Sequence, residues 1–232
     1  DYLADCPIEI GNQIDYTFEI EGKPHVVSIF GTARCTMDSL RRDIGTIVRM
    51  NKEFWGDLPY KRFVFLIHAT TTGSGGTEHV NSVVLDYRST VSRNPAPCRG
   101  LVGLISHEFF HTWNIKQLRP KGMDPYDWTS ENYYKELWIA EGATSYLHGL
   151  LLLRNGYSSA RQYLDGIDSA VQYDRQRPGN TVQSLTESSF DAWIKFFRNT
   201  QQAYDFETDL YRKGGNVSLL LDLEIRHRSG NT

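Results

Sequence analysis

Hydrophobic and polar residues follow two different periods along this chain of 232 residues. As far as about residue 98 the pattern indicates strands. Residues 14–20 (IDYTFEI) alternate between apolar and polar positions, and the turn EGKP then leads into HVVSIFG, so the pair predicts a β-hairpin. Two further strands are predicted at 62–69 (RFVFLIHA) and 82–88 (SVVLDYR), with the glycine-rich segment TTGSGGTEH leading into the second.

One helix interrupts this run of strands. Residues 36–55 carry apolar side chains at helical spacing, and Thr36 or Ser39 is a suitable N-terminal cap. This spacing places five apolar side chains on one helical face: Leu40, Ile44, Ile47, Val48 and Phe54.

From residue 99 onward the spacing becomes helical. Five segments show it: RGLVGLISHEFFHTWNI, KELWIAEGATSYLHGLLLLRNG, SSARQYLDGIDSAVQY, ESSFDAWIKFFR and KGGNVSLLLDLEIRHR. Gly156 is predicted to end the second, and Pro178-Gly179 to separate the third from the fourth. A sheet-containing half (about 1–98) before an all-helical half (about 99–232) predicts an α+β fold, with a site in the cleft between the halves of one domain, 1–232.

Composition narrows the classes of function. The chain is 40% hydrophobic and 12% aromatic, enough for a sizeable core, and its formal net charge of −3 gives no sign of a nucleic-acid or anionic-membrane partner. No apolar run approaches the roughly 20 residues that cross a bilayer. The cysteines, Cys6, Cys35 and Cys98, are widely spaced and predict free thiols or at most one disulfide. Nothing in the sequence indicates the compartment or the oligomeric state.

The segment SHEFFHTWN (106–114) carries two histidines one helical turn apart. At positions i and i+4, His107 and His111 lie on one face of a helix and can reach one metal ion. Glu108 is turned by about 100° around the helix axis from His107, close to the metal but not first in line to bind it. A base that acts on water held by the metal belongs there. The motif favours a zinc hydrolase over a core helix that uses histidine for packing.

A catalytic zinc usually takes three protein ligands, so a third must come from elsewhere in the chain. The HExxHxxGxxH continuation is absent, because HTWNIKQLRP has neither Gly nor His at the needed offsets. Glu141 stands out downstream, since a carboxylate among Trp138, Ile139 and Ala143 is costly unless it is paired or metal-bound. The other candidates are Glu131 and Glu136, which are predicted to face solvent, and His148.

These segments resemble a known family. HEFFHTWNIKQLRP, followed after a loop by ELWIAEGATSYLHGLLLLRNG, resembles the glycyl aminopeptidase family of gluzincin metallopeptidases, as do GGTEHVNS, SSFDAWIKFF and YRKGGNVSLLLDLEIRHRSG. The resemblance implies a thermolysin-like catalytic domain that binds one Zn²⁺ through His107, His111 and Glu141, with Glu108 as general base and acid. Members usually carry an N-terminal β domain and often a later PDZ domain, so the chain is expected to be a fragment of a longer protein.

An aminopeptidase must also recognise the α-ammonium group of its substrate, and a carboxylate is the simplest partner for it. GGTEH resembles the G-x-M-E-N segment of the related aminopeptidase N group, with Thr for Met and His for Asn. This implies that Glu78 binds the amine, while Gly75 and Gly76 let the backbone approach the substrate. The strand that follows, SVVLDYR, is expected to pair with an extended peptide.

Tyr211 begins YRKGG, which resembles the Y-x-K-G segment of the same group. The resemblance implies that its hydroxyl donates to the oxyanion of the tetrahedral intermediate, a role for which a neutral, rigidly held phenol is suited. His79 and His148 receive no role and are predicted to be structural.

The function expected from these residues is a zinc-dependent aminopeptidase that acts on peptides with a free N-terminus, and the family name suggests Gly or Ala as the first residue. Two alternatives stay open. One is an endopeptidase on the same scaffold, which would cut blocked peptides internally. The other is a peptide-binding module without catalysis, against which the complete set of predicted catalytic and metal-binding residues argues.

Overall fold

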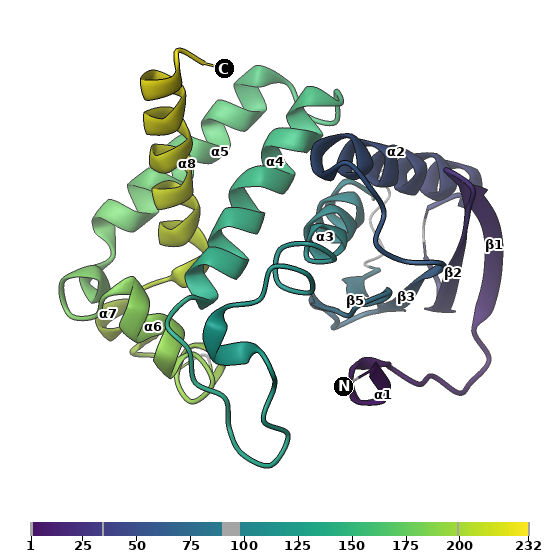
Figure 1. Cartoon of the computed structure of the whole chain (residues 1–232), viewed down its shortest axis with the longest axis horizontal. Helices are drawn as coiled ribbons and strands as arrows, with labels where there is room; N and C mark the ends of the chain where they lie inside the picture. The colour runs from purple at the N-terminus through teal and green to yellow at the C-terminus, as the bar shows by residue number, and fades with distance from the viewer. Residues whose placement is uncertain (1, 34, 90–97, 199, 232) are drawn as a thin grey trace. The chain divides into compact units, whose positions relative to one another are not determined.

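The computed structural model describes residues 2–33, 35–89, 98–198 and 200–231. It divides into two compact units, Asp1–Leu118 and Arg119–Thr232, which are described separately (Figure 1). Unit 1 holds a mixed sheet with helices and unit 2 is helical, so the predicted α+β class is confirmed. The units divide after Leu118, so the HEFFH helix belongs to the sheet-containing unit. A single thermolysin-like domain over 1–232 stays a prediction.

The sheet of unit 1 has the strand order β1-β2-β3-β5-β4. β1 and β2 form the predicted hairpin through Glu21 (φ 53°) and Gly22 (φ 71°), two positive φ angles that a tight hairpin turn requires. β2, β3 and β5 run parallel, and β4 returns antiparallel to β5 at the edge. The bounds are β1 Ile14–Ile20, β2 Lys23–Gly31, β3 Phe63–Thr70, β4 Gly75–Glu78 and β5 Ser82–Arg88.

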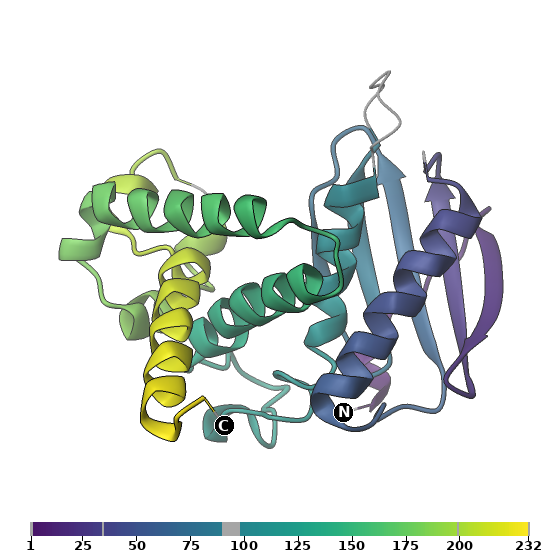
Figure 2. The same ribbon diagram turned by 90° about the horizontal axis from the view of Figure 1, so that it is seen from above.

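Two long helices, α2 (Met37–Trp55) and α3 (Cys98–Phe110), lie on the same face of this sheet (Figures 1 and 2). Phe109 of α3 packs its ring edge-on against Phe63 of β3, with ring centroids 4.9 Å apart, and both side chains are fully buried. This aromatic contact fixes the height of α3 above the strands. The short helix α1 (Tyr2–Asp5) precedes β1.

The sequence pattern of α2 is largely confirmed. The Thr36 side chain accepts a hydrogen bond from Ser39 N, as its predicted cap role requires. Four of the five residues on the predicted apolar face are buried: Leu40, Ile44, Ile47 and Val48. The fifth residue, Phe54, is not buried. It lies in the last turn of the helix, where its ring contacts Phe110 at 5.9 Å while the side chain stays 40% exposed.

Two other predictions for unit 1 need correction. β5 is paired with β3 on one side and β4 on the other, so SVVLDYR has no open edge for a peptide. The helix predicted to run to Ile115 ends at Phe110, where the backbone changes to tighter turns: Thr112 N donates to Phe109 O and Trp113 N to Phe110 O, both at 3.1 Å.

Unit 2 is a set of helices around the last one, α8 (Leu210–Ser229), which contacts α4, α5 and α6. The segment predicted as one helix around Glu141 begins as a π-helix, η2 (Ile139–Ala143), and continues as α4 (Thr144–Arg154). Gly156 (φ 76°) follows the end of α4, as predicted. The remaining elements are η1 Lys121–Met123, α5 Ala160–Gln176, η3 Pro178–Thr181, α6 Leu185–Asp191, η4 Phe196–Arg198 and α7 Ala203–Phe206.

Two further observations bear on the sequence expectations. Cys35 is disulfide-bonded and Cys6 is a free thiol, in agreement with at most one bridge. Across the part of the chain that the structure describes, no helix combines the length and the apolar character needed to cross a membrane.

Candidate metal and catalytic site

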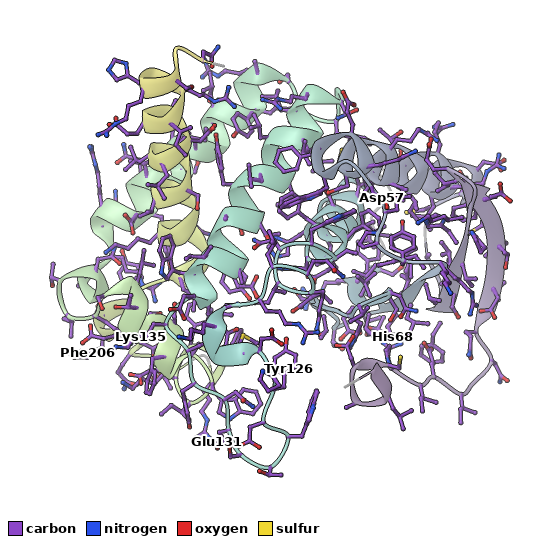
Figure 3. All side chains as sticks on the ribbon, in the orientation of Figure 1. Asp57, His68, Tyr126, Glu131, Lys135 and Phe206 are labelled. Carbon is purple, nitrogen blue, oxygen red and sulfur yellow. The ribbon has the colours of Figure 1, made fainter. Side chains whose placement is uncertain are left out.

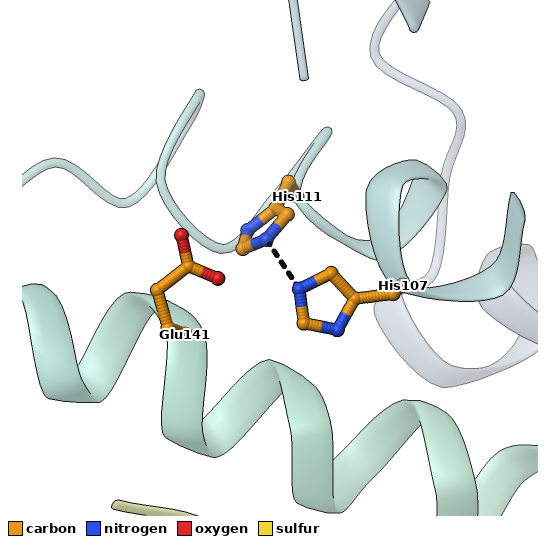
Figure 4. Close-up of side chains that lie close together, drawn as sticks. All are labelled: His107, His111 and Glu141. Carbon is orange, nitrogen blue, oxygen red and sulfur yellow. Dashed lines mark hydrogen bonds between the residues drawn. The ribbon is translucent and has the colours of Figure 1, made fainter. Parts of the chain in front are cut away.

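The two histidines of the motif face each other. His107 lies in the last turn of α3, and His111 stays in helical register because its backbone N–H donates to His107 O at 3.4 Å. Their Nε2 atoms are 3.1 Å apart (dashed in Figure 4), and the rings stand nearly perpendicular at 80°. His111 is 1% exposed and His107 is half-buried. The predicted pairing of these imidazoles is therefore present.

The tautomer of His111 is set by its neighbour Asn114. His111 Nδ1 lies 2.8 Å from the backbone oxygen of Asn114, and because a carbonyl only accepts, Nδ1 carries the proton. The lone pair of the neutral ring is then on Nε2, which points at His107. A second hydrogen bond of this kind is what orients most metal-binding histidines.

The spacing of the two Nε2 atoms fits a zinc ion. Two nitrogens that each lie about 2.0–2.1 Å from a tetrahedral zinc are about 3.4 Å apart. The observed 3.1 Å separation is close to this value, whereas two histidines that merely pack their ring faces would not bring two lone-pair nitrogens together. The residues present therefore fit a metal that takes nitrogen ligands.

Glu108 belongs to α3, and its side chain lies against β4. Its side chain is 6% exposed, and β4 passes so close that a Cβ at Gly76 would lie 2.5 Å from Glu108 Cγ and Cδ. Gly76 was predicted to let the backbone approach a substrate. Its observed effect is to leave room for the carboxylate of Glu108. Gly75, with φ 122°, occupies a backbone conformation that favours glycine.

Glu78 lies at the end of β4, paired with Val83 of β5, and is half-buried. One carboxylate oxygen of Glu78, one of Glu108 and one nitrogen of His111 all lie within 4.8 Å of one another. Two carboxylates so close repel each other unless a cation or a proton lies nearby. The structure thus brings together Glu78, Glu108, His107 and His111, all from unit 1.

Glu141 occupies the π-helix η2 of unit 2 and is half-buried. The apolar stretch around it is less buried than predicted: Ile139 is 43% exposed, and the buried residues of η2 are Ala140 and Gly142. The sequence argument from burial among apolar neighbours was therefore too strong. The π-turn is a different signal, because such bulges occur frequently at functional sites.

The other candidate third ligands are less suitable. Glu131 and Glu136 are exposed, as predicted, and Glu131 accepts a hydrogen bond from the Tyr133 hydroxyl on the loop labelled in Figure 3. Glu136 accepts a hydrogen bond from Lys135 N at 2.9 Å. His148 is half-buried on α4, two turns of helix beyond Glu141.

Tyr211 lies in the first turn of α8 and is half-buried. Its backbone N–H donates to the N-cap residue Asp209 at 3.1 Å, and its ring stacks on Phe196 with centroids 5.7 Å apart. The hydrogen bond fixes the backbone of this turn and the stacking restricts the ring, as a fixed hydroxyl donor requires.

The turn that carries Glu141 is packed directly on the start of α8. A Cβ at Gly142 would lie 2.5 Å from Gly214 Cα, and a Cβ at Gly214 would lie 2.7 Å from Trp138 O. Backbone touches backbone at this crossing, which only glycine permits. The sequence analysis missed the pair, although both glycines are visible as the Gly of WIAEG and the first Gly of YRKGG.

A helix with two facing histidines and a buried glutamate between them is the arrangement of metallopeptidases. A family model described as M61 glycyl aminopeptidase matches residues 100–217, just over half of the chain. The chain belongs to this family of peptidases. A solved structure of an aminopeptidase N family protein from Idiomarina loihiensis is similar, with a TM-score of 0.87 and 30% sequence identity over 96% of this chain. The chain spans 39% of that protein. No curated protein sequence matches it.

Proposed function

We propose that this chain is the catalytic part of a zinc-dependent aminopeptidase, which hydrolyses the first peptide bond of a peptide with a free N-terminus. The observation that carries the proposal is the facing pair His107 and His111, with Nε2 atoms 3.1 Å apart beside the buried Glu108. Membership of the M61 glycyl aminopeptidase family supports the type of reaction.

We assign His107, His111 and Glu141 as the zinc ligands. They are the set that the sequence resemblance implies, and two of them are the facing histidines of unit 1. Two imidazoles and a carboxylate are a donor set of catalytic zinc sites. Another group of described residues that could hold a metal ion, Glu78, Glu108 and His111, contains one histidine. A metal bound there would take Glu108, the proposed base, as a ligand. We also propose that the catalytic domain has a thermolysin-like fold.

When bound, zinc polarises the scissile carbonyl and makes water more acidic. Glu108 takes the proton from the attacking water, and its burial keeps the carboxylate free of competing solvent. Glu108 then passes the proton to the leaving amine. The Tyr211 hydroxyl donates a hydrogen bond to the carbonyl oxygen as negative charge develops there.

Glu78 supplies the selection of a free N-terminus in this proposal. Its carboxylate, close to that of Glu108, forms with it a negative pair that an α-ammonium group would neutralise. The extended substrate pairs with β4, because β4 forms the edge of the sheet and β5 is already paired on both sides. A preference for Gly or Ala at the first position is the expectation that the family description adds.

A pair of matched peptides tests the exopeptidase assignment. A pentapeptide that begins with Gly is incubated in free and in N-acetylated form, and the products are separated by mass. We expect efficient release of the first residue from the free peptide and far slower cleavage of the acetylated one. Equal cleavage of both would make the chain an endopeptidase.

Metal analysis of Glu108→Gln tests the catalytic assignment separately. The amide keeps the volume of the carboxylate but cannot take a proton. We expect zinc content equal to that of the unaltered chain and turnover reduced by at least about 1,000-fold. A variant that keeps its turnover would refute the role of Glu108.

A further inference from the structure

Asp5, near the start of the chain, bonds to two segments that flank the site of unit 1. Its Oδ2 accepts a hydrogen bond from Val80 N at 2.6 Å, and its Oδ1 accepts one from Lys116 Nζ at 2.9 Å. The Nδ1 atom of His79 lies 3.7 Å from the same Oδ1. These partners are 75 and 111 positions away in sequence, so no local pattern links them.

The first segment is the turn directly after Glu78. His79 N donates to Ser82 O at 2.9 Å, and Glu78 pairs with Val83, so Val80 lies within the β4–β5 turn. The Asp5 carboxylate caps the N–H of this turn. It therefore fixes the end of the strand on which the Glu78 carboxylate stands.

The second segment follows His111. Lys116 N donates to His111 O at 3.1 Å, which ties Lys116 to the end of the HEFFH helix through the backbone. The ammonium group of Lys116 then reaches Asp5. One carboxylate thus joins the Glu78 strand and the His111 turn.

The cluster is largely withdrawn from water. The side-chain exposures are 16% for Asp5, 10% for Lys116 and 17% for His79. Burial by itself raises the pKa of the Asp5 carboxyl, but the His79 ring, the Lys116 ammonium and the Val80 N–H together hold that pKa well below its usual range. A charged pair in such surroundings is less screened than a surface ion pair, and loss of one partner is correspondingly more costly.

We propose that Asp5 is a positioning residue, which sets the distance between the Glu78 carboxylate and the His107–Glu108–His111 motif by bonding at once to the turn after Glu78 and to Lys116. This inference rests on the proposed role of Glu78. It goes beyond that role in giving a function to the N-terminal segment, and it gives His79 a place in the same cluster.

The test compares Asp5→Ala with Asp57→Ala. Asp57 also accepts a backbone N–H, that of Leu58 at 2.7 Å, but it lies at the exposed start of the connection between α2 and β3 (Figure 3). We expect Asp5→Ala to raise KM and to lower the ratio of kcat/KM between the free and the acetylated pentapeptide by about tenfold, since small displacements of positioning groups have large effects. Asp57→Ala should leave this ratio unchanged.

Hydrogen exchange supplies a readout that needs no activity. Asp5→Ala should exchange faster in peptides covering 76–83 and in those covering 111–118, with zinc content unchanged. Asp5→Asn keeps an acceptor for Val80 N but loses the charge. It should restore slow exchange in 76–83 but not in 111–118. It also serves if Asp5→Ala fails to fold.

The outcomes separate the two proposals. If the unaltered chain does not discriminate free from acetylated peptide, the proposed function fails, and the exchange pattern alone decides on Asp5. If it does discriminate and Asp5→Ala keeps the full ratio, the positioning role is overturned. Faster exchange of Asp5→Ala in only one of the two segments, or in neither, also overturns it.

Discussion

A side chain at position 76 would occupy the space of the Glu108 carboxylate. A Cβ on Gly76 would lie 2.5 Å from Glu108 Cγ and Cδ and 2.6 Å from Oε1, far closer than carbon atoms pack. Gly76 belongs to the sheet edge and Glu108 to the helix, so one glycine allows the two elements to approach. The orientation of the proposed base thus depends on a residue 32 positions earlier.

Gly76→Ala is therefore expected to displace Glu108 while leaving the histidine pair in place. We predict a fall in kcat of about 100-fold with little change in zinc content, because a displaced base no longer reaches its proton. The free energy of unfolding should drop by about 1–3 kcal/mol through overpacking. Steady-state kinetics, metal analysis and urea unfolding measure the three quantities.

Gly103→Ala is the matched control for this substitution. Gly103 lies on α3, the same helix as Glu108, and a Cβ there meets no atom within 4 Å. We expect unchanged kinetics and a gain of up to about 1 kcal/mol in the free energy of unfolding, since alanine favours helix. Equal kinetic losses in both variants would show that the Gly76–Glu108 contact has no bearing on the base.

The parts of the fold that the sequence predicted are those with local signals. The hairpin, α2 with its Thr36 cap, and strands β3 and β5 follow from short-range alternation or helical spacing, and the structure contains all of them. The edge strand β4 was not predicted, because its residues, GGTE, have low strand propensity and form a strand only by pairing with β5.

The site residues that could be predicted are those whose chemistry depends on their spacing along the sequence. His107, Glu108 and His111 lie within five residues, and the i, i+4 rule brings the imidazoles together. The supporting contacts were not predictable. Asp5 and Gly76 make their contacts across long sequence distances. A π-turn differs from an α-helix by one residue in the spacing of its hydrogen bonds, which apolar spacing does not resolve.

The assignment of Glu141 predicts a difference between two nearby glutamates. Glu141→Gln should weaken zinc binding by more than about 100-fold, because an amide oxygen is a neutral and poorer ligand. Glu136→Gln should bind zinc as the unaltered chain does, since Glu136 is exposed. Titration against a competing chelator measures both affinities. Loss of affinity in Glu136→Gln alone would transfer the ligand role to that residue.

The crossing of Gly142 and Gly214 predicts that the Glu141 turn is sensitive to added volume. Gly142→Ala places a methyl group 2.5 Å from Gly214 Cα, so the π-turn must shift, and we expect a loss of about 1–3 kcal/mol together with weaker zinc binding. Gly166→Ala on α5, where a Cβ meets no atom within 4 Å, should change neither. If Gly142→Ala left the zinc affinity unchanged, the Gly142–Gly214 crossing would have no role in zinc binding.

His25 predicts how the stability of unit 1 depends on pH. Its side chain is fully buried between Lys23 O and the Tyr60 hydroxyl, and burial, with the charge of Lys23, lowers its pKa from the ordinary value near 6.5. The unfolded chain therefore binds more protons than the native one below about pH 6.5, so the free energy of unfolding falls as the pH drops from 7.5 to 5. His25→Gln should be less stable at pH 7.5 but lose less over this range, in urea unfolding at several pH values. The exposed His227, replaced by Gln, should leave the slope as it is, and a slope unchanged in His25→Gln would show that His25 does not set it.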